Sequence, residues 1–168
     1  MKSTAKSILI TLLITSAFNF NAQKLGHVNS QAIVQELPDY ESARKELESY
    51  KGDLAKELEM YQKLIMEFAQ DYEQKKSEMS ADSRQRKEAD LMERQQNYEK
   101  KAYEAEQKLQ QKEQELLQAI MIKVNNAVKE LAKKDGYSYI FEVSTLLHAG
   151  GDDISDKVRE KLGITTSN

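Results

Sequence analysis

Apolar positions in the middle of the chain recur in alternating steps of three and four residues. Such spacing is typical of coiled-coil helices, because it places every apolar residue on one face. An extra step of four, between Leu54 and Leu58, is a stutter that locally relaxes supercoiling, so we expect a helix that is straight or bent near Gly52. The first series consists of Tyr40, Ala43, Leu47, Tyr50, Leu54, Leu58, Tyr61, Ile65, Phe68 and Tyr72.

A second series with the same spacing follows after a short polar stretch. Polar residues occupy two of its positions, Gln95 and Lys112, and the stretch from Tyr40 to Lys134 has one glycine and no proline. Good helix formers dominate throughout. The two series therefore predict two long helices that meet along a narrow apolar seam. The second series consists of Leu91, Tyr98, Ala102, Ala105, Leu109, Leu116, Ile120, Val124, Val128 and Leu131.

The segment Glu78–Arg84 is the candidate connection between these helices, because Ser80 and Asp82 can cap a new helix. One continuous helix is the alternative, since nothing in the segment forbids it. A continuous helix would hold its ends on the order of 140 Å apart. An antiparallel hairpin, with helices of about 57 Å and about 80 Å, instead brings both ends of the helical stretch together. The hairpin is favoured because it lets the flanking strand-like segments meet.

Strand-like sequences flank the helical stretch on both sides. The segment KLGHVN at 24–29 alternates weakly, and Asn29 or Ser30 can cap a short helix that Pro38 ends. Beyond Gly136, a candidate helix C-cap, YSYIFEV at 137–143 places its aromatic residues on one face. We expect it to form a hairpin with TLLHA, followed by a GGDD turn.

A final short helix is expected over ISDKVREKLG, with Ser155 as N-cap and Gly163 as C-cap. The longer second helix of the hairpin becomes most apolar near its C-terminal end. Such a broad apolar surface suits packing against the strands, whereas a narrow seam suits a free arm. The apolar residues of this end are Leu116, Leu117, Ile120, Met121, Ile122, Val124, Ala127, Val128 and Leu131.

The predicted fold is mainly α, with a long antiparallel coiled-coil hairpin projecting from a small β body. We expect a signal segment over 1–22, the body over 23–39 and 135–168, and the arm over 40–134. Such a small body buries too little apolar area to be stable alone, so several copies are expected to close their strands around an axis. The candidate residues of this oligomeric base are Val28, Ile33, Tyr137, Tyr139, Phe141, Val143 and Leu147.

Residues 1–22 have the features of a cleavable secretory signal peptide. Lys2 and Lys6 give a positive start, and the apolar run 7–18 is short for a membrane span. Cleavage is expected within a few residues of Ala22. An uncleaved membrane anchor is the alternative. The sequence therefore predicts export.

Charge and residue types exclude several functions. Without Lys2 and Lys6, 23 basic residues face 28 acidic ones, which is not the basic surface that nucleic-acid binding demands. The chain has no cysteine, which excludes disulfides and leaves a zinc site short of ligands. His27 and His148, both expected in strands, have no partner nearby in sequence. With no phosphate-binding loop and only solvated carboxylates, we predict no enzyme, no cofactor and no metal.

Two segments carry a family resemblance. GHVNSQAIVQELPDY at 26–40 and AKKDGYSYIFE at 132–142, with DISDKVREKLG after it, resemble the Skp/OmpH family of periplasmic chaperones. The resemblance covers essentially the whole chain after residue 22. It implies a jellyfish-shaped homotrimer in the periplasm, with a β-barrel body and three helical arms around a cavity. It further implies an ATP-independent holdase that keeps unfolded outer-membrane β-barrel proteins from aggregating until membrane insertion.

The chain departs from this family in its charge. The best-known member is strongly basic, which favours acidic clients and lipopolysaccharide, whereas this chain is acidic. The family's transient contact with the membrane or lipopolysaccharide is therefore not assigned to particular residues of this chain. Near the arm tip, basic residues alternate with acidic ones, so a solvated face of mixed charge is favoured there over an anion site.

Several apolar or amphipathic residues of the arm fall off the predicted seam. Scattered surface residues are one interpretation. The other is a dilute and adaptable surface for clients without a fixed shape, which flexible methionines suit. The candidate client contacts are Met60, Leu64, Met66, Met92 and Tyr103. The alternative function is an exported coiled-coil spacer or adaptor of the cell envelope, with well-packed arms and one fixed partner.

Overall fold

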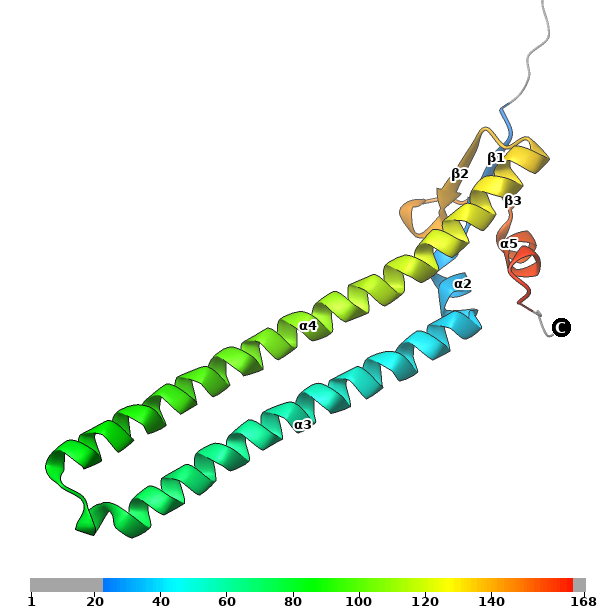
Figure 1. Ribbon diagram of the computed structural model, residues 1–168. Coiled ribbons are helices and arrows are strands. Elements are labelled where there is room, and N and C mark those ends of the chain that lie inside the picture. Colours follow the sequence, from blue (N-terminus) through cyan, green and yellow to red (C-terminus); the bar gives the residue numbers. More distant parts are fainter. Residues whose placement is uncertain (1–22, 165–168) are drawn as a thin grey trace, which may run out of the picture.

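The computed structural model describes residues 23–164. Figure 1 shows two long helices running side by side in opposite directions, away from a small body formed by the strands and short helices. The expected helical hairpin is confirmed, whereas the predicted signal segment lies outside the described residues. In chain order the elements are β1 (Leu25–Val28), α2 (Ser30–Glu36), α3 (Pro38–Lys75), η1 (Lys76–Glu78), α4 (Ala81–Asp135), β2 (Tyr139–Glu142), η2 (Val143–Thr145), β3 (Asp152–Asp153) and α5 (Ser155–Lys161).

The ends of the two arm helices follow from local sequence. Pro38 opens α3, where its fixed φ and missing N–H cost nothing. The α3 helix then continues through Gly52. At the tip, the Ser80 hydroxyl oxygen accepts a hydrogen bond from the Ser83 N–H at 3.3 Å, so the predicted break is confirmed. The α4 helix ends at Gly136, whose φ of +73° is the left-handed conformation that glycine adopts without strain.

The seam of the hairpin is well covered only at its two ends. Ala43 on α3 and Ile120 on α4 are buried near the body, and Tyr72 is buried at the tip. Between them, the predicted apolar seam residues from 47 to 68 and from 91 to 116 are only half-buried. Two helices shield only one face of each other, so water still reaches the seam residues between the two ends. The middle of the arm is therefore held by a weak core.

The three strands form a parallel sheet in the order β2-β1-β3. Parallel neighbours need a crossover connection, and between β1 and β2 the whole arm supplies it. The predicted hairpin of 137–143 with TLLHA is therefore wrong. Residues 143–145 form the turn η2, and the third strand is Asp152–Asp153, where a turn was expected. His148 consequently lies outside the strands.

A glycine allows the third strand to approach the first. A Cβ on Gly151 would lie 2.8 Å from the Leu25 carbonyl oxygen, and its φ is +92°. Any side chain there would displace the chain from β1. The close approach lets the Ile154 N–H donate to the His27 carbonyl oxygen at 3.0 Å.

The core of the body lies between the sheet, the short helices and the C-terminal end of α4. Contrary to expectation, Ser155 is not the N-cap of α5 but its first residue. Its hydroxyl accepts a hydrogen bond from the Asn29 N–H at 3.0 Å, which joins α5 to the start of α2. Asn29 itself caps α2 as expected, while Leu162 rather than Gly163 is the C-cap of α5. The fully buried side chains are Ile33, Leu37, Val124, Ile154 and Val158.

Between residues 23 and 164, no helix has the combination of length and apolar composition that crossing a bilayer requires.

Candidate functional surfaces

The candidate base residues divide into two groups. Val28, Ile33 and Tyr137 are buried in the core of the body within a single chain. Tyr139 and Phe141, by contrast, are 55% and 41% exposed. Val143 is half-buried, and Leu147 is fully exposed in the loop after η2. Only the exposed residues of this set are free to contact another molecule.

The two exposed aromatic residues lie on an edge strand. β2 pairs with β1 on one side, and within the described residues its other edge has no strand partner. Tyr139 and Phe141 alternate with the half-buried Ile140, so they point to the same face, with rings stacked 6.2 Å apart. An unpaired edge beside exposed aromatic rings is a surface suited to joining another strand.

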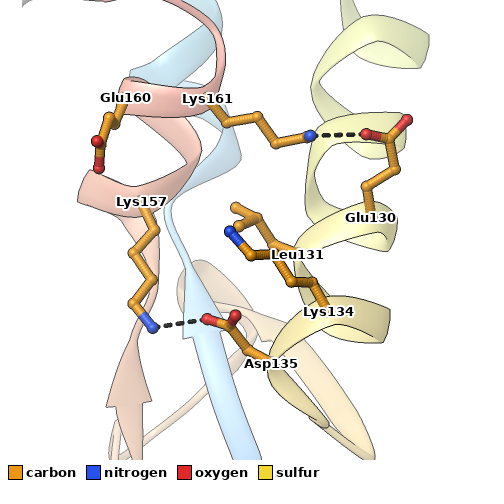
Figure 2. A pocket seen from close by; sticks show the side chains of 7 residues that line it. All are labelled: Glu130, Leu131, Lys134, Asp135, Lys157, Glu160 and Lys161. Atoms are coloured by element: carbon orange, nitrogen blue, oxygen red, sulfur yellow. Dashed lines mark hydrogen bonds and ion pairs between the residues drawn. The ribbon is translucent and has the colours of Figure 1, made fainter.

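A cavity of about 510 Å³ lies between α5 and the C-terminal end of α4 (Figure 2). Two ion pairs span it, Lys161 with Glu130 at 2.6 Å and Lys157 with Asp135 at 2.7 Å. Hydrogen bonds from these lysines lower the pKa of Glu130 and of Asp135, and the bond to Asp135 raises the pKa of Lys157. All of these shifts favour the charged forms. The cavity is therefore a place where ion pairs hold α5 to α4.

His27 is a buried strand residue beside a carboxylate. Its Nε2 lies 3.8 Å from an Asp153 carboxylate oxygen, and its Nδ1 is buried without a hydrogen-bond partner among the described atoms. The hydrogen bond from Ser155 is the main cause that lowers the pKa of Asp153. Over residues 23–164, no three histidine, cysteine or acidic side chains are arranged to hold a metal ion.

The arm presents its candidate client contacts to solvent. They are among the most exposed large apolar side chains of the described chain. Their exposed fractions are 54% for Met60, 48% for Leu64, 66% for Met66, 62% for Met92 and 63% for Tyr103.

Three further apolar residues of α4 are also exposed, which sequence reasoning missed. Leu117, Met121 and Ile122 are 36%, 45% and 52% exposed, although we expected them to pack against the strands. The expectation failed because one stripe of α4 faces the body, through Val124, Ala127 and similar residues, and the neighbouring stripes turn to solvent. A helical-wheel comparison with the seam would have separated them.

The arm tip is closed by polar and aromatic contacts. The buried Tyr72 donates a hydrogen bond from its hydroxyl to Glu88 at 2.5 Å, which raises the pKa of Tyr72. Lys87 and Arg94 on α4 each lie 4.4 Å from the centre of the Phe68 ring on α3. These contacts join the two helices where the apolar seam is ending.

Fold and surfaces together define a small body bearing one long, exposed helical hairpin. The model of the OmpH-like outer membrane protein family matches residues 24–162, and the chain belongs to this family. The crystal structure of an OmpH-like protein from Caulobacter crescentus CB15, described as a candidate outer membrane chaperone, has the same fold, with a TM-score of 0.72. The two are 16% identical, and the match covers 87% of this chain and 89% of that one. A comparison with curated protein sequences finds no match.

Membership of this family settles the broad class of function. OmpH-like proteins are chaperones and not enzymes, so this chain has a chaperone role. The exposed apolar side chains of the arm agree with that class.

Proposed function

We propose that this protein is an ATP-independent periplasmic holdase for unfolded outer-membrane β-barrel proteins. The observation that carries the proposal is the arm itself. Along it, apolar side chains such as Met66 and Met92 stay exposed beside a seam that is only half-buried. Each contact with an unfolded client would be weak, and many together would hold it. Release then needs no chemical energy, because no single contact has to be broken at great cost.

The domain boundaries belong to the same proposal. Residues 1–22 direct export and are removed, 23–39 and 135–168 form the assembling body, and 40–134 form the client-holding arm. The client contacts are the exposed arm residues Met60, Leu64, Met66, Met92 and Tyr103.

The active form is a homotrimer joined through the β bodies in a barrel-like base. The unpaired edge of β2, with Tyr139 and Phe141 exposed beside it, supports this assembly. Joining edges would cover the aromatic rings and satisfy the free backbone groups of the strand. Three arms projecting from one base would then surround a client. Membrane or lipopolysaccharide contact would be transient, since the pairing of opposite charges along the arm offers no strongly basic surface.

An aggregation assay tests the holdase. A urea-unfolded outer-membrane β-barrel protein is diluted into buffer with or without the mature chain, and light scattering is followed without nucleotide. Suppression near one oligomer per client is expected. Unchanged scattering with a folded, oligomeric protein would contradict the holdase and favour an envelope spacer.

The assembly has its own test. Tyr139→Asp with Phe141→Asp should reduce the sedimentation mass to that of one chain, because joining the edges would then bury two carboxylates that have no partner. Tyr103→Asp on the arm is the matched control, since Tyr103 is exposed far from β2. An unchanged mass in the double variant would show that β2 is not the interface.

A further inference from the structure

The two sides of the arm seam differ, and this difference identifies where a client segment binds. Residues one position before or one position after a seam residue lie about 100° to either side of it around the helix. We call the side formed by the preceding positions the paired flank, and the side formed by the following positions the open flank. In an antiparallel hairpin, the same flank of each helix faces the other.

Interhelical ion pairs lie on the paired flank. On α3, Asp39, Glu46 and Glu57 each precede a seam residue by one position. They pair with lysines of α4, in an arrangement that joins acid on one helix to base on the other. The pairs are Asp39 with Lys123 at 2.6 Å, Glu46 with Lys112 at 2.5 Å and Glu57 with Lys101 at 3.9 Å.

Cations over aromatic rings close the same flank further towards the tip. Lys101 lies 4.7 Å from the centre of the Tyr61 ring, and Arg94 lies 4.4 Å from that of Phe68. The hydrogen bond with Tyr61 raises the pKa of Lys101, and the one with Glu46 raises the pKa of Lys112. A hollow on this flank, lined by Leu54, has a volume of only about 10 Å³.

The open flank instead contains a groove of about 600 Å³ between the two helices. Leu47 and Leu109 form its apolar floor. A further apolar pocket of about 70 Å³ adjoins it, with Leu47 in common, and extends it towards Leu116 and Leu117. Among the interhelical ion pairs found between α3 and α4 in residues 23–164, none crosses this groove.

Most of the exposed apolar residues of α4 are on this open flank. Met92, Tyr103, Leu117 and Met121 each follow a seam residue by one position, as does Met66 on α3. Met60 and Leu64 precede seam residues and belong to the paired flank. The groove and these side chains together form a track along one side of the arm.

The charges of the groove rim identify the kind of occupant. Three basic residues line it, Arg44, Lys45 and Lys51, and three acidic ones balance them, Glu41, Glu48 and Glu113. A balanced rim does not attract a polyanion such as a nucleic acid or a lipid A headgroup. Leucines below a rim of both signs suit an extended polypeptide, whose apolar side chains enter the groove while its backbone and polar side chains stay at the rim.

We propose that the open flank of the hairpin is the binding track for extended, apolar-rich segments of unfolded clients, with the groove over Leu47 and Leu109 as its principal subsite. This inference rests on the proposed holdase function and deepens it. The ion pairs and cation–aromatic contacts of the other flank keep the helices together while the open flank exchanges its own weak seam contacts for those of the client.

Site-specific photocross-linking tests the track directly. A photoreactive amino acid replaces Lys51 on the groove rim or, in the matched control, Asp53, which precedes a seam residue on the same turn of α3. Each full-length mature chain is mixed with a urea-unfolded outer-membrane β-barrel protein and irradiated. We expect several times more client adduct from position 51 than from position 53. Equal yields, or no adduct from either position, would overturn the track.

A substitution pair gives an independent readout. Leu117→Ser removes an apolar side chain from the pocket that adjoins the groove, whereas Ile122→Ser removes one that is more exposed and lines neither cavity. About fivefold more Leu117→Ser protein should be needed to suppress aggregation, with Ile122→Ser near the unsubstituted chain. Equal effects would overturn the track. Failure of the unsubstituted chain to suppress aggregation would instead overturn the holdase proposal, and the cross-linking yields would still decide the track.

Discussion

The contrast between a dense body and a weakly packed arm leads to a quantitative prediction. Ile33 on α2 is 0% exposed, inside the core between the sheet, α4 and α5. Leu58, on the seam midway along α3, is only half-buried. Substituting each by alanine, as Ile33→Ala and Leu58→Ala, removes three carbon atoms of a branched aliphatic side chain. The chemistry is matched, so burial decides the difference in the free energy of unfolding.

The expected losses in the free energy of unfolding differ by about a factor of three between the two variants. Ile33→Ala loses the full transfer free energy of its carbons and leaves a cavity in a core that cannot collapse, for a loss of about 3–4 kcal/mol. Leu58→Ala loses roughly half the transfer term, about 1 kcal/mol, because water already reaches the side chain and fills the space. A loss of about 3 kcal/mol is a large share of the stability of a small domain.

Urea unfolding followed by far-ultraviolet circular dichroism measures both variants. Each is compared with the unsubstituted chain at one fixed protein concentration, because assembly adds to apparent stability by mass action. A loss for Leu58→Ala equal to or greater than that for Ile33→Ala would refute the reasoning, since the arm seam would then carry as much stability as the body.

Two further predictions concern backbone conformation and pH. Gly52→Ala should raise the free energy of unfolding by about 1 kcal/mol, because a Cβ there meets nothing within 4 Å. Gly136→Ala should lower it by about 1 kcal/mol, because φ at Gly136 is +73°. Thermal melting measures both variants, and a shift of the same sign for both would contradict this prediction. Arg159 donates two hydrogen bonds to Glu36, at 2.7 and 2.9 Å, and they lower the pKa of Glu36. The stability that this ion pair adds to the folded state is fully present above the unfolded pKa of Glu36, near 4.5, and is lost as pH falls through the lower folded pKa. In Glu36→Gln, the free energy of unfolding should therefore fall less steeply as pH is lowered. An unaltered acid limb would show that the pair contributes no pH dependence.

Local sequence determined much of this protein. The three-and-four spacing identified residues that are buried or half-buried along the arm, from Tyr40 to Ile120, and its continuation through Val124 and Leu131 identified the stripe of α4 that packs into the body. The helix caps at Asn29, Ser80 and Gly136 were also predictable from the sequence. Periodicity and capping depend on neighbours within a few residues, so the chain encodes them directly.

The sheet and the two flanks were decided only by the tertiary structure. Both β2 and β3 pair with β1, from which they are separated by more than a hundred residues, and no local pattern states that these pairings are parallel. The TLLHA segment has the composition of a strand, yet its first residue ends the turn η2 and residues 146–149 lie outside the sheet, beside an edge of β2 that has no strand partner in the described chain. The relative rotation of α3 and α4 likewise decides which side of the seam is closed by ion pairs and which side holds a groove. This rotation arises from packing over the whole length of the arm, so it cannot be predicted from single positions in the sequence.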